Sequence, residues 1–350
     1  MATWYANESS ESSESSESSE SSESSESSES SESSAVAGMG AYSGRRTSTL
    51  LAQALWNTQG ELTRGITLPG APDYSSQRPN ADDAMLRWAA DVRARLYQFE
   101  LTSPLYFERA SDDQATLWRQ AAAPASVQQG NPSVTFQKCH TLLRPKYDYN
   151  DAMAQPAPAN SPGDPLADEL LDVMQKAALR PDRLAEILTQ VVPPFAFFAS
   201  VLNLRPGRRR RTFELMSAVQ TFGSVVGQQF KHAFRVVRPA ERSALIQPII
   251  MTPGHGSYPA GHAVQCHLQR TVLTELLKLP AKGEADGQLL RLADRIGENR
   301  IVAGLHYKTD IAQGKELGES LGGYVIDMAT NNATSVPALN WLWRQAQLET

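Results

Sequence analysis

The sequence predicts an all-α protein that folds as a helical bundle, and two observations support this prediction. Apolar residues recur at helical spacing in most of the chain after residue 82, whereas the alternation of apolar and polar residues that marks a half-buried strand is scarce. With 350 residues, the chain is long enough for one large domain or two modest ones.

The first predicted helix covers residues 83–99, and its apolar residues are Leu86, Ala89, Val92, Leu96 and Phe99. Further helices are predicted at 165–179, 182–202, 212–234, 261–279, 287–301, 309–329 and 336–348. The helix at 212–234 ends before Arg238-Pro239, because the residue before a proline disfavours the helical conformation. The most apolar stretch, 191–204, is short and contains two prolines, so we expect a buried helix there and no membrane span.

The chain divides into three predicted parts. Residues 1–40 form a tail that should be disordered, since the nine Glu-Ser-Ser triplets at 8–34 contain no apolar side chain to bury. Residues 41–164 form an N-terminal helical region, and residues 165–350 form the catalytic core with its motifs at 231–310.

The charge of the chain favours an anionic ligand. Without the nine glutamates of the tract, 29 acidic residues face 33 basic ones, so the body is mildly basic. This bias is far below that of a nucleic-acid binder, and no nucleic-acid partner is expected. The two cysteines do not form a zinc pattern, and the first ten residues lack the regions of a signal peptide. The compartment stays open, with the cytoplasm as the default, and so does the oligomeric state.

The first motif runs from Lys231 to Pro239 and reads KHAFRVVRP. Lys231 and Arg238 are seven residues apart, so a continuous helix would carry both cations on one face. Such a pair is weak evidence by itself, because charged helix faces usually contact water.

The second motif, GSYPAGHA, runs from Gly256 to Ala263 and leads into an apolar helical pattern. A helix that begins here offers backbone N–H groups to an anion. Gly261 would let the anion approach the backbone closely, and His262 would lie beside it in the first turn.

The third motif, NRIVAGLHYKTD, runs from Asn299 to Asp310. Arg300 has a permanent charge and a planar fork that suits an oxyanion. His306 and Asp310 are four residues apart, so on a helix the carboxylate would hold one imidazole N–H and leave the other nitrogen as a nucleophile or ligand.

In order and spacing, the three motifs resemble the signature of the superfamily of vanadium haloperoxidases and type 2 phosphatidic acid phosphatases (PAP2). That signature reads K-x6-R-P, then P-S-G-H, then S-R-x5-H-x3-D. Here 19 residues separate Pro239 from Pro259, and 37 separate His262 from Arg300. The resemblance covers residues 231–310 and implies a helical bundle of the vanadium haloperoxidase/PAP2 type.

The resemblance also implies roles for the motif residues. The oxygens of vanadate, or of phosphate in the same site, would be bound by Lys231, Arg238, Arg300 and the Gly261 amide. His306 would be the covalent partner, as the ligand of vanadium or the nucleophile on phosphorus, and Asp310 would orient it. His262 would act as the general acid and base.

Two positions depart from the signature. Ala260 stands where the signature has a serine, so one hydroxyl donor to the anion is missing, and we expect weaker anion affinity or an altered or lost activity. Asn299 replaces the serine before Arg300, which is a milder change.

Three features favour the soluble bromoperoxidase-like branch of the superfamily. No membrane span is predicted, whereas the lipid phosphatases span membranes. Tyr258 completes YPAGHA, which is similar to the YPSGHA typical of haloperoxidases. His255 lies seven residues before His262, where bromoperoxidases of this family carry a second pocket histidine, although it can equally be a loop residue between two glycines.

The hypothesis is therefore a vanadate-dependent haloperoxidase, a peroxidase that uses hydrogen peroxide to oxidise a halide. Two alternatives stay open. One is a soluble phosphomonoesterase of the acid phosphatase kind, which would hydrolyse a phosphate ester through a phosphohistidine. The other is a non-catalytic relative that only binds an anion.

Deletion of residues 8–34 should change neither the melting temperature nor the activity, because the tract has no apolar side chain to pack. Thermal unfolding of the full and truncated chains checks this expectation. A shift of several degrees would show that the tract binds to the folded body.

Overall fold

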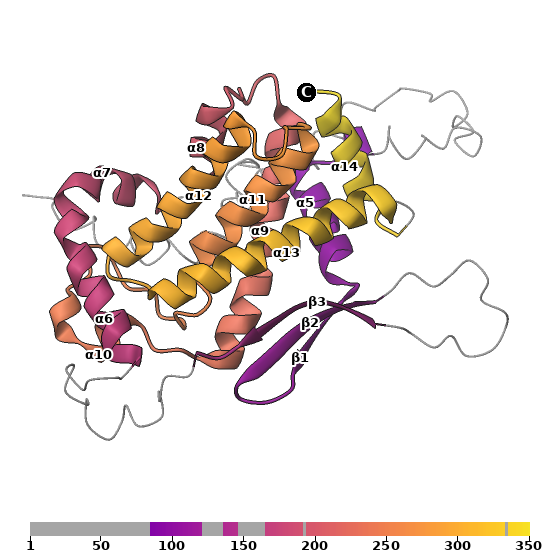
Figure 1. Ribbon diagram of the computed structural model, residues 1–350. Coiled ribbons are helices and arrows are strands. Elements are labelled where there is room, and N and C mark those ends of the chain that lie inside the picture. The colour runs from indigo at the N-terminus through magenta and orange to yellow at the C-terminus, as the bar shows by residue number, and fades with distance from the viewer. Residues whose placement is uncertain (1–84, 121–135, 146–164, 192–193, 333–334) are drawn as a thin grey trace, which may run out of the picture.

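The computed structural model describes residues 85–120, 136–145, 165–191, 194–332 and 335–350. The predicted tail, residues 1–40, lies outside these ranges. Within them the protein is a helical bundle with one small sheet, and the predicted all-α fold class is confirmed (Figure 1). No helix in this part of the chain has the length and apolar character that a bilayer crossing requires.

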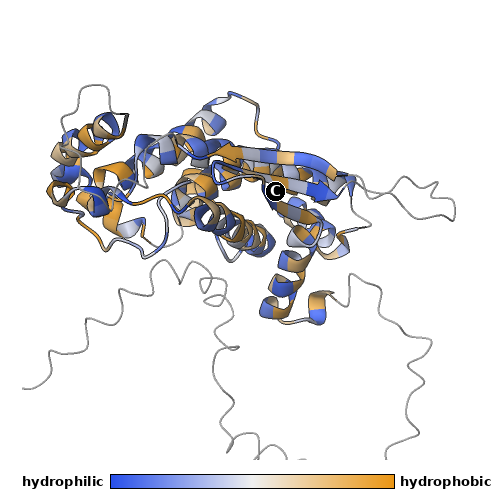
Figure 2. Ribbon diagram, turned by 90° about the horizontal axis from the view of Figure 1, so that it is seen from below, coloured by the Kyte–Doolittle hydropathy of each residue, from blue (hydrophilic) through white to orange (hydrophobic). Residues whose placement is uncertain are grey.

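Four helices form the centre of the bundle: α9 (Arg210–Phe234), α11 (Gly261–Leu276), α12 (Glu284–Val302) and α13 (Lys308–Asn331). α11 packs against the other three and most extensively against α13 (Figure 1). All four were predicted from apolar periodicity, and each observed end lies within three residues of the predicted one. In Figure 2, hydrophobic and hydrophilic residues alternate along the helices, as expected of helices with one buried face.

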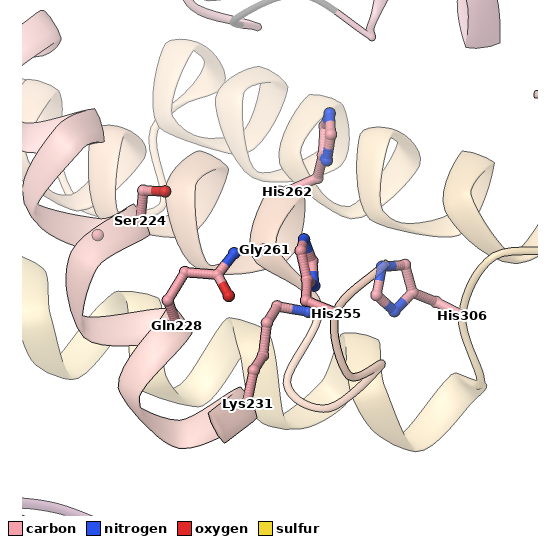
Figure 3. A pocket seen from close by; sticks show the side chains of 9 residues that line it. Ser224, Gln228, Lys231, His255, Gly261, His262 and His306 are labelled. Carbon is pink, nitrogen blue, oxygen red and sulfur yellow. The ribbon is translucent and has the colours of Figure 1, made fainter. Parts of the chain in front are cut away.

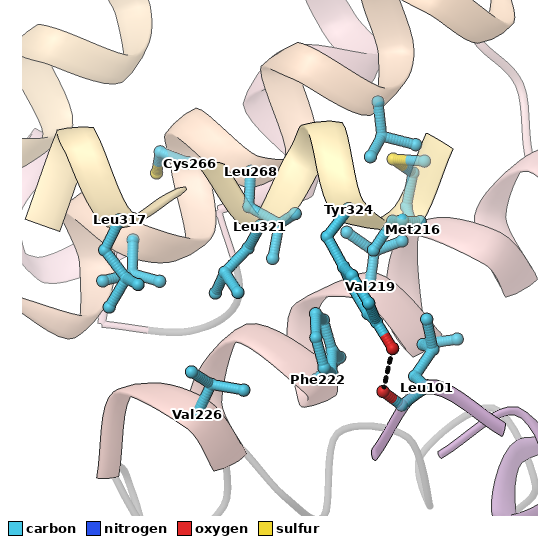
Figure 4. Packing of buried hydrophobic residues seen from close by; sticks show 14 of the residues in the cluster. Leu101, Met216, Val219, Phe222, Val226, Cys266, Leu268, Leu317, Leu321 and Tyr324 are labelled. Atoms are coloured by element: carbon cyan, nitrogen blue, oxygen red, sulfur yellow. Dashed lines mark hydrogen bonds between the residues drawn. The ribbon is translucent and has the colours of Figure 1, made fainter. Parts of the chain in front are cut away.

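The core between these helices is aliphatic and aromatic. Leu317, Leu321 and Tyr324 of α13 meet Phe222 and Val226 of α9, with Leu268 of α11 beside them (Figure 4). The rings of Phe222 and Tyr324 stack with their centroids 5.7 Å apart. The buried Tyr324 hydroxyl donates to the carbonyl of Leu101 at 2.9 Å, so it keeps a hydrogen bond and also links the core to the N-terminal region.

α11 and α13 come close because small residues line their contact. Gly314, Gly318 and Gly322 of α13 recur every fourth residue, on one face. A methyl group added at Gly314 would lie 2.7 Å from the Ala260 carbonyl, and one at Gly318 would overlap the Val264 carbonyl. Backbone atoms cannot move aside as a flexible side chain can. The short distance between α11 and α13 therefore requires glycine at these positions.

The predicted N-terminal helical region, 41–164, differs from the structure where it is described. It contains α5 (Ala90–Thr102) and then an antiparallel sheet of β1 (Leu105–Arg109), β2 (Gln114–Gln120) and β3 (Phe136–Leu143), in the order β1-β2-β3. The strands do not alternate regularly in sequence. They are held from outside, because β3 packs on α13 and the His140 ring hydrogen-bonds Ser320 at 2.9 Å.

The predicted apolar face of the first helix was wrong. Leu86, Val92 and Phe99 are exposed, and the buried face of α5 instead includes Arg93 and Glu100. Each of these two has a partner: the Arg93 guanidinium donates to Glu214 of α9 at 2.6 Å, and the Glu100 carboxylate accepts the first N–H groups of α14 (Pro337–Gln347) at 2.7 and 3.0 Å. These polar side chains can be buried because each has a polar partner, and the spacing of apolar residues cannot predict such pairs.

The helix predicted at 182–202 is two helices, α7 (Arg180–Thr189) and α8 (Phe195–Val201), and Pro194 is the N-cap of the second. The remaining elements are α6 (Pro165–Lys176), the 3-10 turns η3 (Ala177–Leu179) and η4 (Ala244–Ile246), and α10 (Pro239–Arg242). The break after α7 places Gln190 at the end of that helix, where it faces the site described below.

Gly318→Ala should lower the free energy of unfolding by about 3 kcal/mol, because the new methyl group overlaps backbone of α11. Gly323→Ala is the matched control. It lies in the same helix, is exposed, and has nothing within 4 Å of an added methyl group. That substitution should stabilise the protein by about 0.5–1 kcal/mol. Chemical denaturation of both variants measures the difference, and equal effects would contradict the close contact.

Candidate oxyanion site

Backbone hydrogen bonds bring the three motifs together at the ends of four helices. The Ala260 N–H, just before α11, donates to the Asp310 carbonyl in α13 at 3.0 Å. The Ser257 N–H donates to the Val236 carbonyl, after the end of α9, at 2.7 Å. Segments 231–238, 255–262 and 306–310 therefore meet in one place.

Lys231 and Arg238 meet, but they do not share a helix face as predicted. α9 ends at Phe234, Arg235 adopts a left-handed conformation with φ 51°, and Arg238 is the N-cap of α10. Both cations instead reach the loop of the second motif. Lys231 Nζ donates to the carbonyls of Gly256 and Ser257 at 2.9 and 3.0 Å, and Arg238 Nε donates to the His255 carbonyl at 3.0 Å.

The contact between His306 and Asp310 is present, with Nδ1 and Oδ2 3.1 Å apart, but its origin differs from the prediction. His306 lies before α13, Tyr307 is the N-cap, and Asp310 is the third residue of the helix. Its carboxylate accepts the Tyr307 N–H at 3.0 Å. Helix capping, rather than a shared helix face, therefore brings the carboxylate to the imidazole.

The hydrogen bonds of His306 define its tautomer. Nε2 lies 3.3 Å from an Nη atom of Arg238, and a guanidinium can only donate. Nε2 must therefore carry the lone pair, and Nδ1 carries the proton that it donates to Asp310. This is the form that a histidine nucleophile or ligand needs.

Ser257 is a site residue that the sequence did not reveal. Its hydroxyl donates a short hydrogen bond to Asp310 Oδ2 and lies 3.2 Å from His306 Nδ1. Burial raises the pKa of the Asp310 carboxyl, while the bonds from Ser257 and Tyr307 and the charges of Lys231 and Arg238 oppose that rise. The position of Ser257 inside the second motif was the available signal.

A small cavity of about 10 Å³, which is roughly the space that one water molecule needs, lies beside these groups, and we call it the inner cavity. It is lined by Gly223, Ser224, Gly227, Gln228, Lys231, His255, Gly261, His262 and His306 (Figure 3). A methyl group added at Gly261 would meet nothing within 4 Å, so the start of α11 faces open space. This geometry allows a small anion to approach the first N–H groups of the helix.

His255 belongs to the site by contact. One of its ring atoms, Nδ1, is 3.2 Å from an Nη atom of Arg238, and in Figure 3 its ring lies near the end of the Lys231 side chain and the His306 ring. His255 is a loop residue between Gly254 and Gly256, and it also lines the inner cavity.

His262 and Arg300 both contact Gln190, another residue that the sequence did not reveal. His262 Nε2 donates to the Gln190 carbonyl at 2.9 Å, and its ring points away from those of His255 and His306 (Figure 3). Arg300 donates to the Ile187 carbonyl at 3.2 Å and to the Gln190 side-chain oxygen at 3.4 Å. The end of α7 therefore orients one side of the site.

Asn299 serves the same junction. Its side-chain amide donates to Gln190 Oε1 at 2.9 Å and to Glu186 at 3.1 Å, and its oxygen accepts from Arg183 at 3.2 Å. An asparagine side chain has two N–H donors and a separate acceptor oxygen, whereas a serine hydroxyl has only one proton to donate. This departure from the signature joins α12 to α7.

The site buries more positive than negative charge. Lys231, Arg238 and Arg300 are at most 3% exposed, and Asp310 is 1% exposed. Among the described residues the other buried carboxylates, Glu100 and Asp286, contact α14 and Arg270 instead. Buried charges are costly unless they are compensated, so this arrangement favours a bound anion.

The comparisons with known proteins found a likeness to solved structures. No family model matches the chain, and no curated protein matches it. A solved structure described as the first bacterial vanadium-dependent iodoperoxidase is similar with 18% sequence identity and a TM-score of 0.38. The likeness covers 49% of this chain and 51% of that one, so the chain spans about half the length of that protein.

Ser257→Ala should lower the free energy of unfolding by about 2 kcal/mol at pH 7 and by less at pH 4, because a bond to a carboxylate is stronger than one to a carboxylic acid. Loss of the hydroxyl also raises the pKa of Asp310 further. A carboxyl whose pKa is higher in the folded protein than in the unfolded chain stabilises the fold fully at pH values below its unfolded pKa. This stabilisation is lost as the pH rises through the pKa of the folded protein. The variant should therefore show a larger deficit as pH rises.

Denaturation at both pH values measures this dependence. Ser224→Ala, a serine of the inner cavity on α9, is the matched control and should show no such trend. A deficit of Ser257→Ala that is equal at pH 4 and pH 7 would contradict the bond to an ionised Asp310.

Proposed function

We propose that the protein is a vanadate-dependent haloperoxidase, in which His306 holds the vanadate and hydrogen peroxide oxidises a halide. One observation carries the proposal: Lys231 and His306 line a cavity at the start of α11, and the buried Arg238 contacts His306 Nε2. The sequence motifs supply the choice of vanadate, through their resemblance to the haloperoxidase signature.

The residues present fit a tetrahedral oxyanion. A buried dianion needs compensating positive charge, which Lys231, Arg238 and Arg300 would supply. One buried carboxylate, Asp310, cancels part of that positive charge. The start of α11 adds the partial positive charge of a helix N-terminus. Lys231 now donates to two backbone carbonyls, so a bound anion would compete with these for its N–H groups.

The site residues would then have separate roles. Asp310 and Ser257 would keep the proton on His306 Nδ1 and leave Nε2 to bind. Arg238, already in contact with His306 and His255, would hold an oxygen between them. His262 would move a proton only after its bond to the Gln190 carbonyl opens. Vanadate itself would supply Lewis-acid activation of the peroxide.

A phosphomonoesterase is the second candidate, and the His306 tautomer favours it equally. A lone pair on Nε2 with a proton held on Nδ1 is also what attack on phosphorus requires. The non-catalytic alternative keeps the same anion site without turnover.

Parallel assays separate the three functions. The full chain is tested for bromination of a dye with vanadate, peroxide and bromide, with each component omitted in turn, and for hydrolysis of a phosphate ester. Bromination that requires vanadate supports the proposal. Hydrolysis alone would replace it by the phosphatase, and neither activity would leave an anion-binding protein.

His306→Ala should abolish whichever activity is found, by at least about a thousandfold, because it removes the covalent partner and not merely one hydrogen bond. His140→Gln on β3 is the matched control, since that histidine contacts Ser320 and not the cavity. Circular dichroism and melting curves check that both variants fold. Activity of His306→Ala within a few-fold of the unchanged protein would contradict the covalent role.

Phosphate should compete with vanadate for a single site. Both are tetrahedral oxyanions, and the cavity offers cations and N–H groups that do not distinguish the central atom. Calorimetric titration with vanadate at increasing phosphate concentration measures the competition. Independent binding of the two anions would contradict a shared site.

A further inference from the structure

A second and larger pocket adjoins the inner cavity, and we call it the outer pocket. It has a volume of about 560 Å³ and is lined by Gln228, Lys231, His232, Arg235, Val236, Val237, Glu241, Gly254, His255 and Gly256. Gln228, Lys231 and His255 line both spaces. The outer pocket is therefore positioned as the approach to the inner cavity, and it has room for an organic molecule.

Arg235 is the exposed cation of this pocket. Its Nε donates to the His232 carbonyl at 3.3 Å, and in the part of the chain that the structure describes no carboxylate forms an ion pair with it. The other two charged side chains are engaged elsewhere. Lys231 donates to the carbonyls of Gly256 and Ser257, and the one acid, Glu241, accepts the Arg238 N–H at 2.7 Å.

The end of α9 holds Arg235 at the rim. Its N–H donates to the Lys231 carbonyl at 2.9 Å, and its φ of 51° is a left-handed conformation that glycine adopts more easily. The chain therefore carries an arginine at a backbone position where glycine would suit the helix end better.

The remaining wall matches an organic molecule with one charged end. Val237, which is partly buried, supplies apolar surface, and the planar fork of a guanidinium pairs with a carboxylate or phosphate through two parallel N–H groups. A neutral reactive end would then extend toward His255, at the boundary with the inner cavity.

We propose that the outer pocket is a subsite for the anionic end of an organic substrate, whose carboxylate or phosphate is bound by Arg235. That the bound molecule is a substrate rests on the proposed function, while its binding can be measured without turnover. The inference deepens that function by naming the acceptor as an anionic organic compound.

Calorimetric titration of the full chain tests the subsite in the absence of vanadate and peroxide. The probes are 4-hydroxybenzoate, phenylphosphonate and the neutral 4-hydroxybenzyl alcohol, so the first two arms separate a carboxylate from a phosphate-like ligand. The variants are Arg235→Gly and, as the matched control, Lys278→Gly. Lys278 is also exposed and left-handed, with φ 51°, but follows α11 and lines neither pocket.

One or both anionic probes should bind the unchanged protein about five- to tenfold more tightly than the neutral probe, a preference that added salt weakens. Arg235→Gly should abolish this preference without lowering the melting temperature, because glycine suits the left-handed backbone. Lys278→Gly should retain it.

Equal affinity of the unchanged protein for charged and neutral probes would overturn the proposal, and so would a preference that survives in Arg235→Gly or disappears in Lys278→Gly. A preference that follows Arg235 in a protein without halide oxidation would overturn the proposed function and leave the subsite standing. The two failures are thus distinguishable.

Discussion

The close contact between α11 and α13 is the constraint on which the rest of the structure depends. Gly314 and Gly318 let the helix backbones approach until a methyl group no longer fits. At the end of this contact the Ala260 N–H reaches the Asp310 carbonyl, so the two helices start side by side. The N–H groups that begin α11 and the imidazole that precedes α13 therefore border one cavity, although more than 40 residues separate them in sequence.

The positive charge gathered at this junction links stability to binding. Lys231 and Arg238 are buried, and their N–H groups are satisfied by carbonyls of the loop at 255–257. Hydrogen bonds of this kind satisfy the donors, and the nearby carboxylate of Asp310 offsets part of the repulsion between the cations. An anion that binds only the folded protein removes part of that repulsion and stabilises the fold by mass action. The excess of buried cations at this junction thus favours an anionic ligand.

The sequence predicted the helices of the bundle and most of the residues at the site, because apolar periodicity and motif spacing are local properties of the chain. It did not predict the sheet, whose strands depend on packing against α13. Gln190 was missed because it lies outside all three motifs, 72 residues before His262 in sequence. Only the fold brings its carbonyl to the His262 ring. Lys231 and Arg238 were predicted on one helix face, but both instead hydrogen-bond the loop of the second motif. The spacing of residues within the first motif cannot predict a contact with another motif.

The alanine at position 260 has a structural meaning that the comparison with the signature alone does not show. Ala260 is the N-cap of α11, and no side chain caps this helix end. A serine at an N-cap accepts the N–H of the second or third helical residue through its hydroxyl oxygen. That bond would occupy a donor of the helix start, while the hydroxyl proton could still point to an anion. Alanine removes the hydroxyl donor but also removes the competitor for the helix N–H groups. In the proposed function, this departure would shift recognition of the anion from a side chain to the backbone, where Gly261 leaves open space.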